Sequence, residues 1–228
     1  MSRTDDQKRE VGEAAANLVR TGMVVGLGTG STAAWFVRSL AARGLNIRGV
    51  ATSQSTAMLA SSLGLSVISL DEVSRIDLTI DGADEIGPGL ALIKGGGAAL
   101  LREKLVWEAS SRCVAIADAG KRVQRLGAFP LPIEVIPFGH LSTARRISDA
   151  LSACGLQITP KLRLQDGAPV RTDQGNYIYD APCGAIDEPT KLAGALKAVT
   201  GVVDHGLFLN LADEALIAGP SGVERLTL

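Results

Sequence analysis

Residues that can take part in proton transfer stand close together near the middle of the chain. Asp81 and Asp84 come first, Lys94 and the glycines Gly95–Gly97 follow, and Glu103 lies in the next segment. Carboxylates can act as general acids or bases, while a lysine and backbone amides can stabilise a developing oxyanion. A purely structural segment has little use for this combination, so we expect a site that moves protons on a small anionic substrate.

The candidate base is Glu103, which lies in a helical pattern over residues 98–108. Side chains three and four positions apart share one face of a helix. At those spacings from Glu103 the sequence has only apolar residues, Ala99, Leu100, Val106 and Trp107. Because an apolar environment disfavours a charged carboxylate, we expect the pKa of Glu103 to rise toward the range of a general base. The alternative is a side chain that reaches water at the edge of this face.

A predicted strand leads into the two aspartates. Residues 75–80 alternate in polarity and are rich in β-branched side chains, which is typical of a strand. Asp81 and Asp84 would lie just beyond its carboxyl end, where open α/β sheets bind ligands. Gly82 would let the chain turn tightly enough for both carboxylates to face one pocket. An ordinary Asp-Gly turn explains Asp81 and Gly82 as well, but it explains Asp84 and Glu85 poorly.

The glycines Gly95–Gly97 predict a close approach of the backbone to a ligand. Consecutive glycines weaken regular structure, and at the start of a helix their amides can donate hydrogen bonds to an anion. A flexible hinge is the alternative interpretation.

A second glycine cluster, Gly26–Thr32, ends an apolar run and precedes a helical pattern. Strand, turn and helix start would place backbone amides and the positive end of a helix dipole at a phosphate. A dinucleotide fingerprint needs a glycine where Ser31 stands and an acidic residue about 20 positions later, and a P-loop needs Gly-Lys-Ser/Thr. Neither is present, and the segment Thr52–Thr56 is rich in hydroxyls. A monophosphate therefore fits better than NAD or ATP.

Several motifs in order resemble those of the A-type ribose-5-phosphate isomerases. They are Gly26–Thr32, Asp81–Ile86, Lys94–Lys104, Ile116–Lys121 and Phe129–Pro137, and the likeness continues through Thr172–Asp180 and Gly206–Phe208. The resemblance covers nearly the whole chain. It implies interconversion of D-ribose 5-phosphate and D-ribulose 5-phosphate through an enediolate, in the non-oxidative pentose phosphate pathway. Because the sequence has no clustered metal ligands and no dinucleotide fingerprint, we expect no cofactor and no metal. The resemblance also implies a homo-oligomer, dimer or tetramer.

The resemblance further implies roles for individual residues. Thr29–Thr32 would line the phosphate end with Lys8, Glu103 would be the base, and Lys121 would contribute to substrate binding. The substrate-binding set is Lys8, Thr29, Gly30, Ser31, Thr32, Asp81, Gly82, Ala83, Asp84, Lys94, Gly95, Gly96, Gly97 and Lys121, and the catalytic set is Glu103, Asp81, Asp84 and Lys94. Ring opening would fall to Asp81 or Asp84, with the choice between them open. Gly120 departs from the family, which often has serine there.

Composition bounds the class of protein. The chain has 228 residues and a net charge of −1, so it lacks the basic footprint of a nucleic-acid-binding protein. Its three cysteines show no metal-like spacing, and His140 and His205 are isolated. The polar start does not match a signal peptide, and no apolar run approaches membrane length. We therefore expect a cytoplasmic enzyme that binds a small sugar phosphate, with no nucleic acid and no membrane.

The predicted fold is α/β, a Rossmann-like domain with a parallel sheet and a second, smaller α+β domain. Strand and helix patterns alternate through Gly120, and the character changes at Phe129–Pro137. We expect residues 1–128 with 201–228 to form the Rossmann-like domain and residues 129–200 the small one. The family likeness sends the last strands, 202–209, 214–218 and 223–228, back to the first domain.

Two other functions fit parts of the sequence. A sugar-phosphate-sensing regulatory domain could share the fold, but the chain has no separate helix-turn-helix segment and a sensor does not need Glu103. An NAD-dependent dehydrogenase is disfavoured by Ser31 and by the missing acidic residue after Val50.

Overall fold

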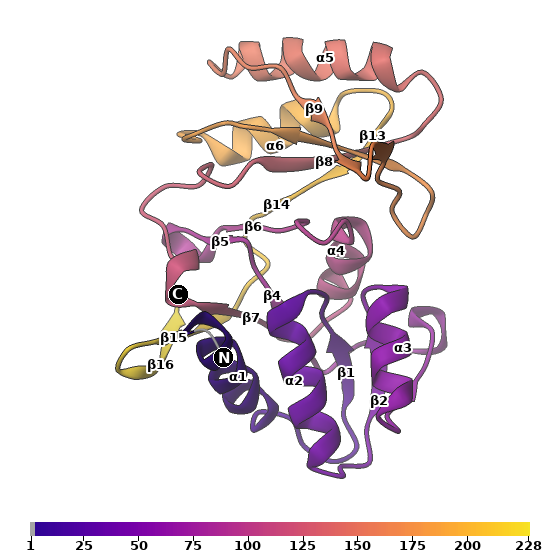
Figure 1. Ribbon diagram of the computed structural model, residues 1–228, viewed down its shortest axis with the longest axis vertical. Coiled ribbons are helices and arrows are strands. Elements are labelled where there is room, and N and C mark those ends of the chain that lie inside the picture. Colours follow the sequence, from indigo (N-terminus) through magenta and orange to yellow (C-terminus); the bar gives the residue numbers. More distant parts are fainter. Residues whose placement is uncertain (1–2) are drawn as a thin grey trace. The chain divides into compact units, whose positions relative to one another are not determined.

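A computed structural model describes residues 3–228, apart from the side chain of Arg3, and shows an α/β fold (Figure 1). The chain folds into two compact units. The first holds the described residues up to Ala83 together with Arg102–Arg122 and Asn210–Leu228, and the second holds Asp84–Leu101 and Val123–Leu209.

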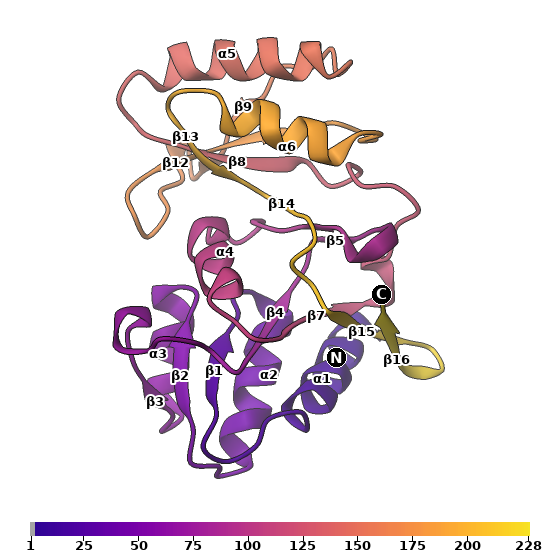
Figure 2. The same ribbon diagram turned by 180° about the vertical axis from the view of Figure 1, so that it is seen from behind.

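The first unit is built on a seven-stranded sheet in the order β16-β15-β7-β4-β1-β2-β3. The strands are β1 Val24–Leu27, β2 Arg48–Ala51, β3 Ser66–Val67, β4 Leu78–Gly82, β7 Cys113–Asp118, β15 Glu214–Gly219 and β16 Gly222–Thr227. Every neighbouring pair is parallel except β15 and β16, which are antiparallel and lie side by side at one edge (Figure 2). The predicted parallel sheet is confirmed.

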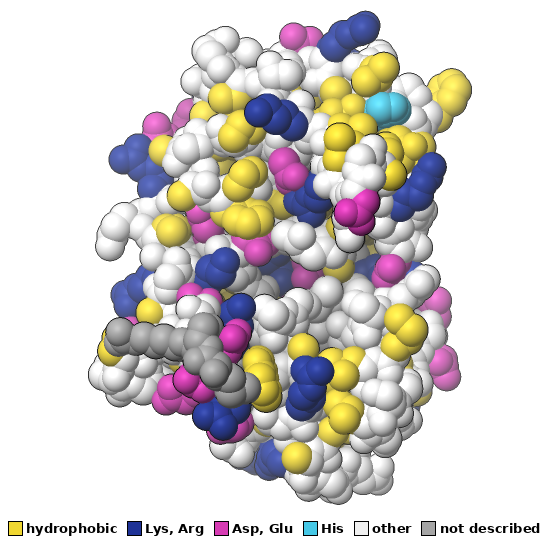
Figure 3. Space-filling model, viewed as in Figure 1, with side chains coloured by type: hydrophobic (Ala, Val, Ile, Leu, Met, Phe, Trp, Pro, Cys, Tyr) yellow, Lys and Arg dark blue, Asp and Glu magenta, His cyan; other side chains and the backbone are white. Residues whose placement is uncertain are grey.

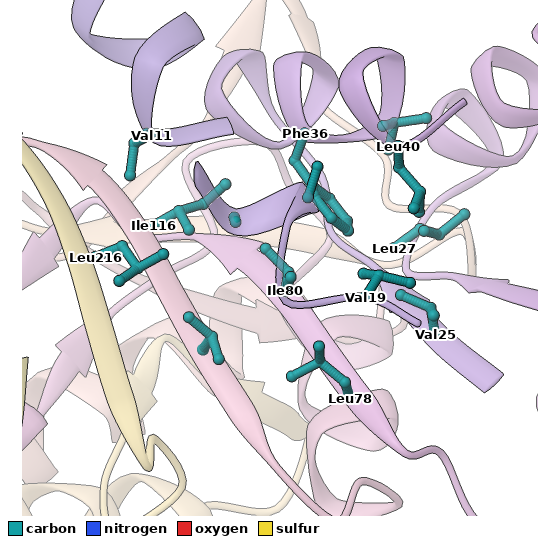
Figure 4. Close-up of a cluster of buried hydrophobic side chains, with 14 of the residues drawn as sticks. Val11, Val19, Val25, Leu27, Phe36, Leu40, Leu78, Ile80, Ile116 and Leu216 are labelled. Atoms are coloured by element: carbon teal, nitrogen blue, oxygen red, sulfur yellow. The ribbon is translucent and has the colours of Figure 1, made fainter. Parts of the chain in front are cut away.

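Helices cover both faces of this sheet. Successive strand residues point to opposite faces, so apolar side chains on each face can pack against a helix. The helices are α1 Arg3–Ala16, α2 Ser31–Ala42, α3 Gln54–Ser62 and α4 Leu100–Glu108, with 3₁₀ turns η1 Leu70–Glu72 and η3 Ala119–Lys121. Val25 and Leu27 of β1 join the core under α1 and α2, which Figure 4 shows with Phe36 and Leu40 of α2. Val24 points the other way and packs in a cluster with Val106 of α4.

The strand order creates a point at which ligands bind in such sheets. The chain runs from β1 to β2 on one side and later returns to β4 on the other side of β1. The carboxyl ends of β1 and β4 therefore flank a topological switch point, where successive loops leave the sheet in opposite directions.

The second unit holds antiparallel sheets. The main one has the order β13-β8-β12-β9, and smaller ones have the orders β14-β6-β5 and β10-β11. Its elements are β5 Glu85–Ile86, η2 Pro88–Leu90, β6 Leu92–Ile93, β8 Leu131–Val135, α5 His140–Ala153, β9 Lys161–Leu162, β10 Leu164–Gln165, β11 Ala168–Pro169, β12 Tyr177–Ala181, α6 Pro189–Lys197, β13 Val202–His205 and β14 Leu207–Phe208. Side chains of α5 and α6 share a core with Ile133 of β8 and Tyr179 of β12.

The unit bounds differ from the expected domains. Residues 84–101, 123–128 and 201–209 group with the second unit, whereas the sequence analysis placed them in the first. The reason is strand pairing, because β6 pairs with β5 and β14, and β13 pairs with β8. The expectation that residues 202–209 return to the first sheet was therefore wrong, while β15 and β16 do return to it.

Two local predictions also need correction. The predicted strand at 75–80 is β4, Leu78–Gly82, so Asp81 lies within the strand and not beyond it. Its neighbour Gly82 has no left-handed φ, so no tight glycine turn is formed there. The predicted helix start at Ala98 is also too early, because Ala98 has φ of 57° and the helix begins at Leu100.

Candidate active site

Asp81 and Thr29 meet at the switch point of the first unit. Asp81 is fully buried near the end of β4, and its Oδ1 accepts hydrogen bonds from the backbone N–H of Thr29, at 3.0 Å, and of Gly82, at 2.7 Å. An added Cβ on Gly28 would lie 2.2 Å from Asp81 Oδ1, so only glycine permits this approach. The carboxylate thus orders the loop that follows β1.

Hydroxyl groups hold the Thr29 side chain. Its Oγ1 lies 2.7 Å from Thr52 Oγ1 and donates to Ser53 Oγ at 2.8 Å. Thr56 Oγ1 lies 3.2 Å from the same atom and donates to the carbonyl of Gly28 at 2.9 Å. These side chains follow β2, the parallel neighbour of β1, so the carboxyl ends of two adjacent strands are joined by hydroxyl contacts.

The segment after Thr29 is suited to an anion. Gly30 is the N-cap of α2 and has φ of 104°, a conformation that favours glycine. No side chain caps this end of α2, and its first turn contains no acidic residue. The first backbone N–H groups of a helix have no intrahelical partner and carry the positive end of the dipole. The exposed Ser31 and the half-buried Thr32 stand in this turn.

Glu103 lies in the first turn of α4 and is only 4 % exposed. The neighbours predicted to share its face, Ala99, Leu100, Val106 and Trp107, are all buried. Ala99 precedes the helix, so the shared face within α4 is made by the other three. Glu103 is therefore on a buried face of α4, so its side chain does not reach water at the edge of that face.

Two lysines of the predicted set also belong to the first unit. Lys121 ends η3, the turn that directly follows β7, and β7 is the parallel neighbour of β4. Lys121 therefore comes from the same edge of the sheet as Asp81. Lys8 is half-buried on α1, which packs beside α2 (Figure 1).

In the second unit, Asp84 and the glycine segment are in contact. The N–H of Asp84 donates to the carbonyl of Ile93, and Asp84 Oδ2 accepts the N–H of Gly96 at 2.8 Å. An added Cβ on Gly96 would lie 2.7 Å from Asp84 Oδ1, which explains a glycine at this position. Gly96 and Gly97 are exposed, so their backbone is accessible to a ligand.

Lys94 is buried beside this segment, with 1 % of its surface exposed. Its backbone N–H donates to the carbonyl of Gly206 at 2.9 Å, and its side-chain Nζ lies 5.4 Å from the centroid of the Phe208 ring. A buried ammonium group acts more strongly on nearby charge than one in water, because the local dielectric is lower.

Two further buried carboxylates of the second unit have structural partners. Glu85 accepts hydrogen bonds from the backbone N–H of Gly127 and Phe129. Glu134 Oε1 accepts from Thr172 Oγ1 at 2.8 Å and Asn176 Nδ2 at 2.9 Å. Burial raises the pKa of Glu134, and the hydrogen bonds oppose that rise.

Cys113 and Cys183 are poor nucleophiles at neutral pH, because the raised pKa of each keeps the thiol protonated. Burial, aided by the charge of Asp213, raises the pKa of Cys113 to about 12, and burial raises the pKa of Cys183 to about 11. All three cysteines are free. Among residues 3–228, no group of three or more histidine, cysteine, aspartate or glutamate side chains is placed to hold a metal ion.

Comparison with known proteins identifies the family. The family model described as ribose 5-phosphate isomerase A (phosphoriboisomerase A) matches residues 48–222. Ribose-5-phosphate isomerase A of Caulobacter sp. (strain K31) is 67% identical over 222 residues, which cover 97% of this chain and 98% of that protein. The chain belongs to the ribose 5-phosphate isomerase A family. A more distant member, from Parvibaculum lavamentivorans, is 49% identical over 96% of this chain and 97% of its own.

Solved structures of the family agree with the fold. Ribose 5-phosphate isomerase A from Neisseria gonorrhoeae is 35% identical with a TM-score of 0.91, covering 100% of this chain and 98% of that one. A D-ribose-5-phosphate isomerase solved in complex with phospho-erythronic acid is 36% identical with a TM-score of 0.92, covering 100% of both chains. The predicted α/β, Rossmann-like fold is therefore confirmed.

Part of the site's framework was absent from the predicted set. Thr52, Ser53 and Thr56 hold Thr29, although the sequence analysis noted their segment only as rich in hydroxyls and free of acidic residues and named none of them as a site residue. Their position after β2, next to β1 in a parallel sheet, is the signal that could have identified them. Of the predicted residues, the structure joins Thr29 with Asp81 in the first unit and Asp84 with Gly96 in the second.

No helix among the described residues is long and apolar enough to cross a membrane.

Proposed function

We propose that this chain interconverts D-ribose 5-phosphate and D-ribulose 5-phosphate through an enediolate. The observation that carries the proposal is its membership of the ribose 5-phosphate isomerase A family over nearly its full length. The local geometry is compatible with this reaction, because an uncapped helix start, buried carboxylates and a buried lysine are the groups that it needs.

The phosphate of the substrate would bind at the start of α2. Thr29, Gly30, Ser31 and Thr32 supply hydroxyls and backbone amides, and Lys8 adds a positive charge. Interactions at this non-reacting end position the reacting carbons. Free ribose should therefore be a much poorer substrate than its 5-phosphate, and inorganic phosphate should compete weakly.

The sugar would contact two short segments and one further lysine. These are Asp81, Gly82, Ala83 and Asp84, then Lys94, Gly95, Gly96 and Gly97, together with Lys121. Ring opening moves the proton of the C1 hydroxyl away and delivers a proton to the ring oxygen. Asp81 or Asp84 would carry out this transfer.

Glu103 would move the proton between the two carbons. It removes the hydrogen from C2, the C1–C2 double bond of the enediolate forms, and the former aldehyde oxygen gains negative charge. Lys94 and the glycine amides would stabilise that oxyanion. Glu103 then returns the proton to C1, the C2 hydroxyl loses its proton to become the ketone, and the oxygen on C1 is protonated.

A turnover assay tests the proposal. Purified protein mixed with ribose 5-phosphate should form ribulose 5-phosphate until equilibrium, observed by absorbance or NMR, without NAD. If no ribulose 5-phosphate forms above the uncatalysed rate, the proposed function is wrong.

The chain would act as a homo-oligomer, a dimer or a tetramer, in the cytoplasm and in the pentose phosphate pathway. Exposed apolar residues support self-association, since Phe138 is 91 % exposed and Leu141 63 % exposed near the start of α5. Figure 3 shows hydrophobic side chains, in yellow, gathered beside the histidine, in cyan, that is visible in the second unit. Free thiols fit a reducing compartment. Sedimentation should give a mass above one chain, and Phe138→Asp should shift it toward the monomer; a wild-type monomer would contradict this.

A further inference from the structure

The glycine segment Gly95–Gly97 is held by an arginine that lies outside every motif noted in the sequence. This residue, Arg163, stands between β9 and β10 in the chain. Its NH1 atom donates to the carbonyl oxygens of Gly95, at 2.9 Å, and of Gly96, at 3.0 Å. Both carbonyls thus share one guanidinium group.

Arg163 is itself held by Asp180. Its Nε donates to Oδ2 of Asp180 at 2.8 Å, and its NH2 donates to Oδ1, so the pair is bidentate. The side chains are only 16% and 25% exposed, which shields the pair from water. The two contacts with Asp180 therefore fix the orientation of the guanidinium plane from which NH1 donates to the glycine carbonyls.

The backbone around this pair is also fixed. The N–H of Arg163 donates to the carbonyl of Ile178, and its carbonyl accepts the N–H of Val170. Asp180 lies in β12, opposite Lys161 of β9. Both members of the pair thus come from hydrogen-bonded strand segments of the second unit.

The carbonyl contacts determine where the amides of the segment point. In a trans peptide the C=O and the following N–H point in opposite directions. Holding the Gly95 carbonyl against Arg163 directs the N–H of Gly96 away from it, where Asp84 Oδ2 accepts that N–H at 2.8 Å. By the same geometry, holding the Gly96 carbonyl directs the N–H of Gly97 away from Arg163.

We propose that Arg163, fixed by Asp180, is a positioning residue that orients the Gly97 amide toward the oxyanion of the enediolate, while Asp84 holds the Gly96 amide. This inference rests on the proposed function. Preorganised donors stabilise a transition state because they need no reorientation during the reaction. Arg163 acts through the glycine backbone and does not touch the reacting atoms.

A lysine cannot replace this arginine. The contacts use the Nε, NH1 and NH2 atoms together, and only a planar guanidinium offers donors in three directions at once. The ammonium of Arg163→Lys could reach either Asp180 or the glycine carbonyls, but it would lose the fork that joins them.

The experiment compares Arg163→Ala, Arg163→Lys and Asp180→Asn with wild type. Because a displacement of about 1 Å can cost about 100-fold in rate, kcat of Arg163→Ala should fall by about 10- to 100-fold. Inhibition by phospho-erythronic acid should weaken in parallel, since a sugar acid bears negative oxygens at the reacting end. Inhibition by inorganic phosphate should stay within about twofold, because the first helix turn of α2 is untouched. Added guanidinium ion should restore part of the kcat of Arg163→Ala and should not stimulate wild type.

The matched control is Arg125→Ala. Arg125 forms an ion pair with Asp187 at 2.7 Å, but these side chains are 60% and 77% exposed and the pair touches no glycine of the segment. Exposed pairs contribute little to stability, so activity and thermal stability should be unchanged.

The outcomes separate this inference from the proposed function. A wild-type protein that fails to isomerise ribose 5-phosphate overturns the function and the inference together. If wild type is active and kcat of Arg163→Ala is within about twofold of the wild-type value, the loss is well short of the effect of a misplaced group. That result overturns the inference alone. The same holds if Arg163→Ala loses phosphate inhibition and kcat together without rescue by guanidinium, since that pattern describes general structural damage.

Discussion

At the scale of single residues, Asp81 connects the end of β4 to the loop after β1. Its Oδ1 accepts the N–H groups of Thr29 and Gly82, and the missing side chain of Gly28 leaves room for it. One buried carboxylate thus orders a loop from another strand. A change at Gly28, which is outside the proposed catalytic set, should therefore disturb the site by displacing Asp81.

We predict that Gly28→Ala lowers both stability and turnover. The new Cβ would lie 2.2 Å from Asp81 Oδ1 and 2.5 Å from Asp81 Cα, so backbone must move. Overpacking of this kind costs about 1–3 kcal/mol. Thermal unfolding and kcat for ribose 5-phosphate measure the effect.

The control for that substitution is Gly194→Ala in α6. A Cβ there meets nothing within 4 Å and no left-handed φ is involved. Alanine should therefore stabilise the helix by up to about 1 kcal/mol with no change in kcat. Equal behaviour of the two variants would contradict the packing argument at Gly28.

At the scale of elements, the start of α2 faces two opposite demands. An acidic residue would favour the helix dipole, but it would repel a phosphate. The first turn of α2 has no acidic residue and no side-chain cap, although both are common stabilising devices. The proposed binding of the substrate phosphate at this helix start would explain why α2 lacks them.

We predict that Ser31→Asp raises stability and weakens substrate binding at the same time. The dipole contributes about 0.3–1 kcal/mol to stability. Repulsion at about 4 Å from the phosphate costs about 1–4 kcal/mol, so KM for ribose 5-phosphate should rise about tenfold or more. Ser31→Asn, without the charge, should raise KM much less. An unchanged KM in Ser31→Asp would show that the phosphate binds elsewhere.

Strand β8 carries a pH-dependent contribution to stability through Glu134. Burial raises the pKa of this carboxyl above its ordinary value of 4.5, so the folded state holds the proton more tightly than the unfolded state. Stability from this group is therefore greatest below pH about 4.5 and declines as pH rises through the raised value.

The test compares wild type with Glu134→Gln, which does not titrate. The difference in unfolding free energy, wild type minus variant, should fall as the pH is raised from about 4.5. Urea denaturation at several pH values measures it. A difference that rises with pH would show that the pKa is lowered in the folded state.

The sequence predicted the elements that have clear periodicity and missed those set by distant contacts. Helix α2 was recognisable because Phe36, Val37 and Leu40 follow helical spacing. The region 202–209 reads as one strand, but the structure divides it at Gly206 into β13 and β14. Gly206 lies against the backbone of Lys94, where an added Cβ would be 2.2 Å from the carbonyl oxygen. No local pattern reveals such a contact.

The same division holds for the candidate site. The sequence analysis named residues of glycine-rich or acidic motifs as candidates. It did not name Arg163, because an arginine between two short strands has no recognisable pattern. Its proposed role depends on contacts with Asp180 and the Gly95 carbonyl, which are 17 and 68 positions away in the sequence. Pairing across strands must be known before such a residue can be identified.

At the scale of the whole molecule, the proposed reaction uses only the side chains and backbone amides of the chain. Lys94 and the glycine amides take the place that a metal ion holds in other isomerisations, stabilising negative charge on oxygen. Turnover of ribose 5-phosphate should therefore be unchanged after treatment with EDTA and buffer exchange. Activity lost in EDTA and restored by a divalent cation would contradict this prediction.

The central claim is that Glu103 carries the proton between C1 and C2, and Glu103→Gln tests it most directly. The substitution keeps size and polarity but removes the base, and general-base catalysis contributes about 10²–10⁴-fold. We therefore expect kcat to fall at least 100-fold with little change in substrate affinity, and exchange of the C2 hydrogen with deuterated solvent to stop. A variant that still isomerises within about tenfold of wild type, below the usual contribution of such a base, would mean that Asp81 or Asp84 takes the proton.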